Sequence, residues 1–542
     1  MTTLPARVPV LIAGGGPSGL AAAVELGRRG VEVIVIEPRT TLDPLRPRAK
    51  TTSVRTMEHL RRWGLADRLR ARAPLPVAHA QDVVFCTGLF GHEITRFPGA
   101  FGLWTTRRDI AAESGHQAPQ PVVEELLREA AAALPSVTLL IGHRVVSVTD
   151  GPDEVRAVVE GPDGERRETA AGYLLGCDGS AGVTRPAIGA RYEGSSGAQP
   201  NLSITFRSLA LDERPLCAVG VHYWVIGAAR GGLMGRLDLA GTWWLIVQGI
   251  DPRDTDPVAL VRTVVGDDVD VDVLATDPWS ARMLLVDRYR GERVFLVGDA
   301  AHLNPPWGGH GFNTCVGDAV NIAWKLAAVL QGWAPPSLLD SYETERRPVA
   351  ERTIAAAGSQ EAFLAPSFAA SGDLDDEGPT GRALRGRLAE ALQVKHPEFH
   401  SLGLVLGYDY PDSPLVVPDG APVPAPDLTV FTPSAHPGAR LPHTWLPDGG
   451  SVHDLLGDGF TLLRLAPGAP VDALLDDAAR AGVPLRLLDL DHVPRLRTLY
   501  GADLVLVRPD QHVAWRGDDV PDPAALLAAV LGAAAVAAPA SP

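Results

Sequence analysis

Residues 8–19 read VPVLIAGGGPSG, and this stretch decides the fold. An apolar strand runs into a glycine turn with Gly14, Gly16 and Gly19 in the G-x-G-x-x-G spacing, and an amphipathic helix follows. Backbone amides and a helix N-terminus can then meet a pyrophosphate. A second apolar strand ends at Glu37, whose carboxylate can accept hydrogen bonds from an adenosine ribose. The sequence therefore predicts dinucleotide binding; the alternative is a glycine-rich turn in an unrelated α/β fold.

A second motif, much later in the chain, distinguishes between NAD and FAD as the expected dinucleotide. Residues 294–313 read VFLVGDAAHLNPPWGGHGFN. Asp299 follows a short apolar strand, so we expect its carboxylate at a strand's carboxyl end, where ligands of open α/β sheets bind. There it can bond a ribityl hydroxyl, a group that FAD has and NAD lacks. Asn313 is expected to cap the long helix that follows. The N-terminus of that helix would stabilise an anionic reduced flavin by roughly 0.5 to 2 kcal/mol.

Further motifs carry a family resemblance over nearly the whole chain. They read RPRA at residues 46–49, RTME at 55–58, PQP at 119–121 and CDG at 177–179. With the two motifs above, they resemble the class A FAD-dependent aromatic hydroxylases, and especially the phenol and polyketide hydroxylase branch with a C-terminal thioredoxin-like domain. The resemblance implies an arginine over the flavin at Arg48, a flavin-contacting glutamine at Gln120, and an element shared by FAD and NAD(P)H at Asp178. A surface arginine in a basic run is the alternative for Arg48.

The expected cofactor site combines both sources of inference. Its residues are Gly14, Gly16, Pro17, Ser18, Gly19, Glu37, Arg39, Arg48, Gln120, Asp178, Asp299, Pro306, Gly309, Gly311, Phe312 and Asn313. No metal site is expected, because the four cysteines have no metal-ligand spacing. The sequence does not identify a general base. Its candidates are His222, Tyr223, Gln248 and His310, and for each of them taken alone the favoured interpretation is a packed or solvated polar residue.

The resemblance also implies a reaction. NADPH or NADH binds transiently and reduces FAD, O2 adds to the reduced flavin, and the C4a-hydroperoxide hydroxylates an electron-rich phenolic or polyketide-type ring. No second G-x-G-x-x-G follows a strand, which argues against enzymes with two dinucleotide domains. Two alternatives stay open. One is another oxidation on the same scaffold, such as dehydrogenation, oxidative decarboxylation or ring cleavage; the other is a flavin-binding homologue without catalysis.

The alternation of strand and helix patterns predicts three units. An α/β, Rossmann-like FAD-binding domain covers residues 1–195 and 286–395. An inserted β-sheet domain for the substrate covers 196–285, where aromatic and aliphatic residues alternate. A thioredoxin-like domain covers 405–542. No cysteine lies beyond Cys315, so this last unit cannot perform dithiol chemistry and is expected to serve packing or a homodimer.

Composition limits the partners and the compartment. The net charge of −16 argues against nucleic acid as a partner, and no apolar run is long enough for a membrane span. Free thiols and the absence of a recognisable signal peptide predict a cytoplasmic protein. Lys50, Lys325 and Lys395 are the only lysines among many arginines. This ratio indicates a coding bias rather than chemistry.

Overall fold

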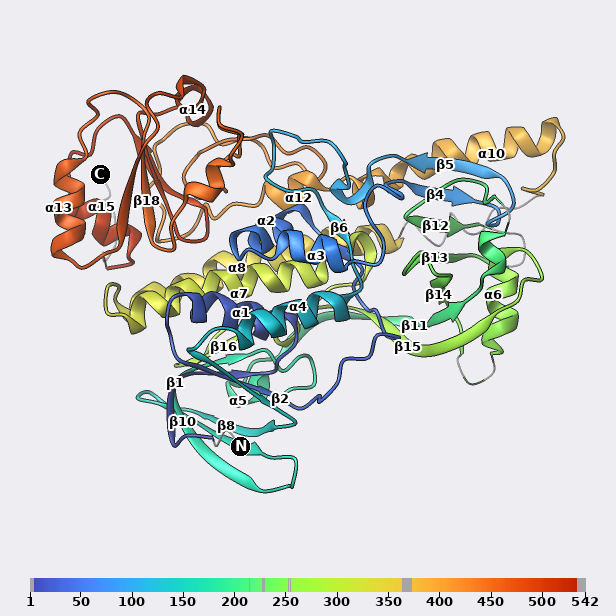
Figure 1. The fold of residues 1–542 in the computed structure, drawn as a ribbon, viewed down its shortest axis with the longest axis horizontal. Helices are drawn as coiled ribbons and strands as arrows, with labels where there is room; N and C mark the ends of the chain where they lie inside the picture. Colours follow the sequence, from blue (N-terminus) through green and yellow to red (C-terminus); the bar gives the residue numbers. More distant parts are fainter. Residues whose placement is uncertain are drawn as a thin grey trace.

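The computed structural model describes residues 4–213, 215–226, 230–251, 253, 255–362 and 373–533. Three large sheets organise the chain (Figure 1). In Figure 1 the seven-stranded sheet lies below the helices α7 (Gly311–Leu330) and α8 (Ser341–Ala362), the eight-stranded sheet lies at their right-hand end, and the C-terminal unit with its four-stranded sheet lies at the upper left. The predicted α/β fold class, with a separate C-terminal unit, is therefore confirmed.

The seven-stranded sheet contains the first motif. Its order is β7-β2-β1-β10-β9-β8, with β16 paired to β10. Strands β7, β2, β1, β10 and β16 run parallel, while β8 and β9 form an antiparallel meander with β10. The bounds are β1 (Arg7–Ala13), β2 (Val33–Glu37), β7 (Val137–Ile141), β8 (Arg144–Asp150), β9 (Val155–Glu160), β10 (Arg166–Gly176) and β16 (Val294–Leu296).

Helices cover one face of this sheet. Val10 and Ile12 of β1 pack into a cluster with residues of the helices α1, α4 and α7, whereas Leu11 and Ala13 pack into a separate cluster with β8 and β9. Alternate residues of one strand thus enter two cores. The helices are α1 (Pro17–Arg28), α2 (Val54–Arg62), α3 (Ala66–Arg72), α4 (Gln120–Ala132) and the short α5 (Thr184–Ala187).

The eight-stranded sheet has the order β17-β15-β11-β14-β13-β12-β4-β5. It draws on more of the chain than the expected range of 196–285, because β4, β5 and β17 come from outside that range. Strands β4 and β5 are short and offered no clear alternation in the sequence. The bounds are β4 (Val83–Cys86), β5 (Glu93–Phe97), β11 (Tyr192–Arg207), β12 (His222–Val225), β13 (Gly232–Arg236), β14 (Thr242–Gln248), β15 (Asp272–Val286) and β17 (His302–Leu303).

Residues 379–399 also pack on the eight-stranded sheet, although the sequence analysis assigns those up to residue 395 to the FAD-binding domain. The helix α10 runs beside β5 (Figure 1). Leu392 and Phe399 join a hydrophobic cluster with Phe85 and Trp224 of that sheet. The elements here are α10 (Pro379–Ala391), α11 (His396–Phe399) and α12 (Leu402–Leu406); α6 (Pro257–Val265) packs on the opposite face of the sheet, and β3 (Thr51–Thr52) pairs with β6 (His116–Gln117).

The C-terminal unit is a four-stranded sheet in the order β19-β18-β20-β21. Its β-α-β-α-β-β-α succession, with β18 parallel to β19 and antiparallel to β20, is the arrangement expected of a thioredoxin-like fold. The bounds are β18 (Phe460–Arg464), α13 (Asp472–Arg480), β19 (Leu485–Asp489), α14 (Pro494–Tyr500), β20 (Leu504–Val507), β21 (Val513–Gly517) and α15 (Pro523–Val530). Within the described residues, no helix is long and apolar enough to cross a membrane.

Candidate cofactor and substrate site

The turn after β1 has the shape that a pyrophosphate needs. A Cβ added to Gly14 would lie 2.2 Å from the Cys177 carbonyl oxygen, and one added to Gly19 would lie 1.9 Å from the Gly14 carbonyl oxygen. Both glycines are therefore required by the packing of the protein itself. Gly16 differs, since its Cβ would meet only the Arg39 guanidinium, at 3.7 Å. The turn is thus open at Gly16, just before Pro17 begins α1 and its unpaired N–H groups.

A carboxylate and a guanidinium flank this opening. Glu37, buried at the end of β2, accepts a hydrogen bond from the Gly15 amide at 2.7 Å. Its other oxygen accepts bonds from the Arg39 amide at 2.7 Å and from Arg39 Nε at 2.8 Å. Arg39 also donates to Glu124 of α4 at 2.6 Å. The expected residues Glu37 and Arg39 therefore lie together at the turn, where a nucleotide's ribose and phosphates would reach both.

The second motif meets the first despite the distance in sequence. Helices α1 and α7 lie side by side (Figure 1), and a Cβ on Gly298 would fall 2.4 Å from Ser18 Oγ. Asp299 follows β16 and is exposed; the Cys315 thiol donates to its carboxylate at 3.6 Å. The Asp299 carboxylate therefore stands at the carboxyl end of a parallel strand with acceptor capacity for a ligand hydroxyl, as the sequence predicts.

Asn313 does not cap α7, and this expectation is wrong. The helix begins at Gly311, so Asn313 lies inside its first turn. Its side-chain amide instead donates to the Thr51 and Gly309 carbonyl oxygens, at 3.0 and 2.7 Å, and accepts from the Ser53 amide at 2.8 Å. The residue thus joins the loop before α7 to β3.

The loop before α7 holds the other expected residues of the second motif. Gly309 has a φ of +68°, and a Cβ there would lie 2.9 Å from Thr51, so glycine is required. A Cβ on Gly311 would meet only Asn304, at 3.5 Å. Pro306 is exposed and Phe312 is partly buried. The N-terminus of α7 therefore opens beside a loop that can approach a planar ring closely.

Arg48 lies in a loop that α4 holds in place. Gln120 is the first residue of α4, and its backbone N–H donates to the Ala49 and Pro47 carbonyl oxygens at 2.8 and 3.1 Å. Arg48 between them is exposed and has a φ of 45°, a left-handed conformation that is costly for a residue with a side chain. Gln120 thus acts on this loop through its backbone, and the Arg48 side chain is presented outward.

Asp178 has a structural partner. Its two carboxylate oxygens accept from the Thr184 amide at 3.0 Å and from the Thr184 hydroxyl at 2.5 Å. Burial raises the pKa of Asp178 above its ordinary value. The side chain therefore fixes the turn into α5, next to Gly14, and any contact with a cofactor would add to that role.

The candidate bases on the sheet point to opposite faces. Tyr223 packs in the core beside α6, where its hydroxyl donates to the Ala218 carbonyl oxygen at 3.0 Å and burial raises its pKa to about 12. It is therefore a structural residue, which corrects its candidacy. His222 faces the other way, 5.0 Å between ring centroids from both Trp244 and Phe101. Gln248 alternates onto the same face as Trp244.

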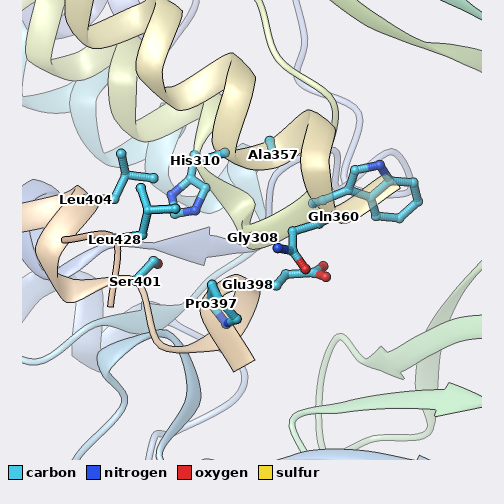
Figure 2. A pocket seen from close by; sticks show the side chains of 11 residues that line it. Gly308, His310, Ala357, Gln360, Pro397, Glu398, Ser401, Leu404 and Leu428 are labelled. Atoms are coloured by element: carbon cyan, nitrogen blue, oxygen red, sulfur yellow. The ribbon is translucent and has the colours of Figure 1, made fainter. Parts of the chain in front are cut away.

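His222 and His310 are both neutral histidines. His222 is 8% exposed; burial, with a smaller contribution from the Lys50 charge, lowers its pKa to about 3, and its Nε2 has no hydrogen-bond partner. Burial lowers the pKa of His310 to about 4. Figure 2 shows the His310 ring among Ser401, Leu404 and Leu428, away from the eight-stranded sheet. His222 is thus the histidine on the aromatic face.

The sequence analysis missed two residues of this face. Lys50, two residues after Arg48, places its ammonium 4.2 Å from the Trp244 ring centroid. Phe101 contacts His222 and, like Arg48, has a positive φ, of 58°. The position of Lys50 in the RPRAK run was a signal that could have drawn attention to it, whereas nothing in the sequence around Phe101 indicates its backbone conformation.

Comparison with known proteins agrees with this geometry. Residues 7–357 match the family model described as FAD binding domain, and residues 434–534 match the one described as aromatic-ring hydroxylase, C-terminal. The chain is 32% identical to phenol 2-monooxygenase of a Pseudomonas strain, over 96% of this chain and 92% of that protein. The chain belongs to the FAD-dependent aromatic-ring hydroxylases.

Two further relatives of this hydroxylase family cover the whole length. A putative polyketide hydroxylase of Streptomyces halstedii is 32% identical over 95% of this chain and 94% of its own. The structure of the rebeccamycin biosynthetic enzyme RebC with reduced flavin superposes with a TM-score of 0.89, at 36% identity over 98% of this chain and all of that one. The protein is accordingly an FAD-dependent monooxygenase.

The residues present fit FAD as the cofactor of this hydroxylase. Gly16 leaves its turn open where a phosphate would lie, Glu37 and Arg39 stand beside that opening, and the exposed carboxylate of Asp299 lies farther along the same edge. Beyond Asp299, the Gly309 backbone and the N-terminus of α7 face the end where a flavin ring would be held. Gly16, Glu37 and Asp299 lie at the carboxyl ends of the parallel strands β1, β2 and β16.

Proposed function

We propose that the protein is a single-component monooxygenase that uses NADPH or NADH and O2 to hydroxylate a phenolic or polyketide-type aromatic compound. The observation that carries this proposal is the contact between Lys50 and Trp244, at 4.2 Å. It joins the loop of Arg48, at the cofactor end, to the aromatic face of the eight-stranded sheet. The names of the phenol and polyketide relatives support the substrate class.

Each group in this arrangement has a defined task. When bound, FAD accepts a hydride from the nicotinamide and activates O2 for insertion into the ring. The rings of His222, Trp244 and Phe101 form an aromatic wall that orients a flat substrate and excludes water. Arg48, exposed beside that wall, is positioned to stack on a planar partner with its guanidinium.

The presence of a single nucleotide fold supports a transient use of the nicotinamide. Within the described residues, only the seven-stranded sheet carries a parallel strand, glycine turn and helix of the dinucleotide type. NAD(P)H would therefore bind from solvent and leave after reduction. The four free cysteines fit a reducing, cytoplasmic compartment.

The test is a reaction with the purified, FAD-loaded protein and a panel of phenols and polycyclic aromatic compounds. We expect the substrate to accelerate NADPH or NADH oxidation and the product to gain one oxygen atom, carrying the label when the gas is 18O2. A product with an unchanged number of oxygen atoms would favour dehydrogenation or a related oxidation. Flavin that neither nicotinamide bleaches, with or without a substrate, would favour a binding protein without catalysis.

A further inference from the structure

The three lysines of the chain occupy interior positions but differ in their partners. Lys325 is fully buried and donates to Glu345 at 2.7 Å and to Asn321 at 2.8 Å. Lys395 is fully buried and pairs with Glu398. Lys50, which is partly buried, forms no ion pair with any carboxylate in the part of the chain that the structure describes. Two of the three ammonium groups are therefore neutralised by the protein, and that of Lys50 is not.

The contacts of Lys50 use only one of the three N–H donors of its ammonium. One hydrogen bond runs to the Arg48 carbonyl oxygen, at 3.0 Å, and the Trp244 ring lies on another side. An ammonium has three N–H donors. Burial lowers the pKa of Lys50 to about 8, with no opposing charge to restore it. Because Lys50 is partly buried and has no carboxylate partner, its ammonium would be stabilised by an anion that binds beside it.

The chain nevertheless holds this ammonium in place. The Ala118 amide donates to the Lys50 carbonyl oxygen at 2.8 Å, and the Gln120 amide bonds the preceding residue, so the backbone is fixed on both sides. The loop accepts the left-handed conformation of Arg48 at the same point. Strain that the surrounding structure maintains is typical of ligand sites.

A second buried polar group contacts the same tryptophan ring as the ammonium. The His222 ring packs on the Trp244 ring in an edge-to-face arrangement, and its Nε2 is buried with no hydrogen-bond partner. This imidazole is neutral, so it offers a polar atom and no competing charge. Lys50 and His222 therefore line one aromatic wall with a cation and an unpaired polar atom, a combination that fits an oxyanion attached to a flat ring.

We propose that Lys50 is a specificity-determining residue that binds an anionic oxygen, phenolate or carboxylate, on the aromatic substrate. The ammonium donates to that oxygen, and His222 contributes its free ring nitrogen beside it. For a phenol, binding as the phenolate releases the proton to solvent and leaves the electron pair on oxygen. The ring then becomes more nucleophilic at its ortho and para carbons. This inference rests on the proposed function only for the location of the substrate.

Binding to the oxidised, FAD-loaded protein tests the proposal without any turnover. Each probe has a partner that lacks the anionic oxygen: 4-nitrophenol with 4-nitroanisole, 2-hydroxyanthraquinone with 2-methoxyanthraquinone, and 2-naphthoic acid with 2-naphthamide. The first two pairs report a phenolate and the third a carboxylate. Phenolates of the nitro and quinone probes absorb visible light, so the spectrum of the bound probe also reports its ionisation. Perturbation of the flavin spectrum reports the colourless probes.

Two substitutions at Lys50 and one control separate charge from packing. Lys50→Met removes the charge at similar volume, and Lys50→Arg keeps it. Arg46→Met removes an exposed cation from the same loop, one that pairs with Asp43 at 3.6 Å. We expect Lys50→Met to weaken binding of the anionic probes by roughly tenfold to a hundredfold, while the neutral partners bind as before. Lys50→Arg should recover part of the loss, and Arg46→Met should change nothing.

Each other result overturns the proposal. Equal affinity of the wild-type protein for the members of every pair would show that no anion site exists, and so would failure to bind any of the anionic probes. Unchanged anion affinity in Lys50→Met, at an unchanged FAD content and thermal midpoint, would assign the site to another residue. Because binding needs no NAD(P)H, a failure of the proposed monooxygenation is seen separately, in the turnover assay.

Discussion

Two residues with side chains adopt the left-handed backbone conformation beside the aromatic wall. Arg48 has a φ of 45° and Phe101 a φ of 58°. Each costs of order 1 to 3 kcal/mol relative to an unstrained residue, so the remaining contacts of each loop must maintain the conformation. Backbone bonds from α4 do so at Arg48. The strained backbone at these two positions therefore lowers the free energy of unfolding, and both positions lie beside the face where we expect the substrate.

Substitutions of Arg48 should separate stability from function. Arg48→Gly removes the backbone strain. We therefore expect its free energy of unfolding, measured in urea, to rise by roughly 1 kcal/mol. The same variant loses the guanidinium, and its flavin should be reduced more slowly in stopped-flow mixing with NAD(P)H. Arg48→Lys keeps the charge without the planar group and should also be slow, at unchanged stability. Wild-type reduction rates in the lysine variant would contradict a stacking role.

At this scale the sequence predicted the residues of the first motif better than those of the sheet. Gly14 and Gly19 are determined by local spacing, and the structure requires glycine at both. His222 and Tyr223 are adjacent on one strand, so strand periodicity alone excludes that both face a ligand. The site of Lys50 depends on Trp244, a contact between distant segments that no local pattern encodes.

Among the elements, a buried charge network fixes the turn that presents Asp299. Asp318 of α7 accepts from Arg346 of α8 at 2.8 Å, from His302 Nε2 at 2.8 Å and from the Gly298 amide at 3.2 Å. The Arg346 guanidinium and the His302 imidazole hold the pKa of Asp318 below its ordinary value despite burial. One carboxylate thus ties β16, β17, α7 and α8 together directly behind the cofactor edge.

Asp318→Asn should weaken both the fold and FAD binding. The amide leaves the buried Arg346 without a counter-charge, which costs about 3 to 5 kcal/mol of unfolding free energy. Since asparagine has one acceptor oxygen where Asp318 has two, it cannot accept from both Arg346 and the Gly298 amide, and we expect FAD affinity to fall in a flavin-fluorescence titration. Asp340→Asn is the matched control, because Asp340 pairs with Arg290 at the surface; its change should stay within about 1 kcal/mol. An Asp318→Asn protein as stable as this control would show that the network is not structural.

Element prediction succeeded where an apolar run lies next to a glycine motif. The strands around Val10 and Val294 and the helix beginning near Gly311 are all apolar runs bounded by glycine. The sequence did not place β4, whose residues 83–86 are buried on both faces and too few to show a period. Its partner β12 lies far along the chain and runs parallel to it. Pairing between such distant segments is set by the assembled core.

In the whole molecule, the C-terminal unit is attached through buried charges as well as apolar packing. Arg508 donates to both oxygens of Glu345 on α8, at 2.6 and 2.8 Å, and to Asp510 of its own unit at 2.6 Å. Arg440 pairs with Glu58 of α2. Apolar residues around Trp324 of α7 pack on β18 and α15. Isolated charged residues in the sequence gave no indication of these partners.

This attachment predicts that the C-terminal unit stabilises the enzyme rather than taking part in its chemistry. Arg508→Met leaves Glu345 and Asp510 buried with fewer counter-charges, so we expect a loss of about 3 to 5 kcal/mol in the urea unfolding free energy. Arg464→Met, which removes a partly exposed partner of Asp489, should cost no more than about 1 kcal/mol. At a temperature where both variants are folded, FAD affinity and the rate of flavin reduction should equal those of the wild type. A stable Arg508→Met protein with impaired reduction would instead connect this interface to the active site, because α8 carries Glu345 and also Arg346, which holds Asp318.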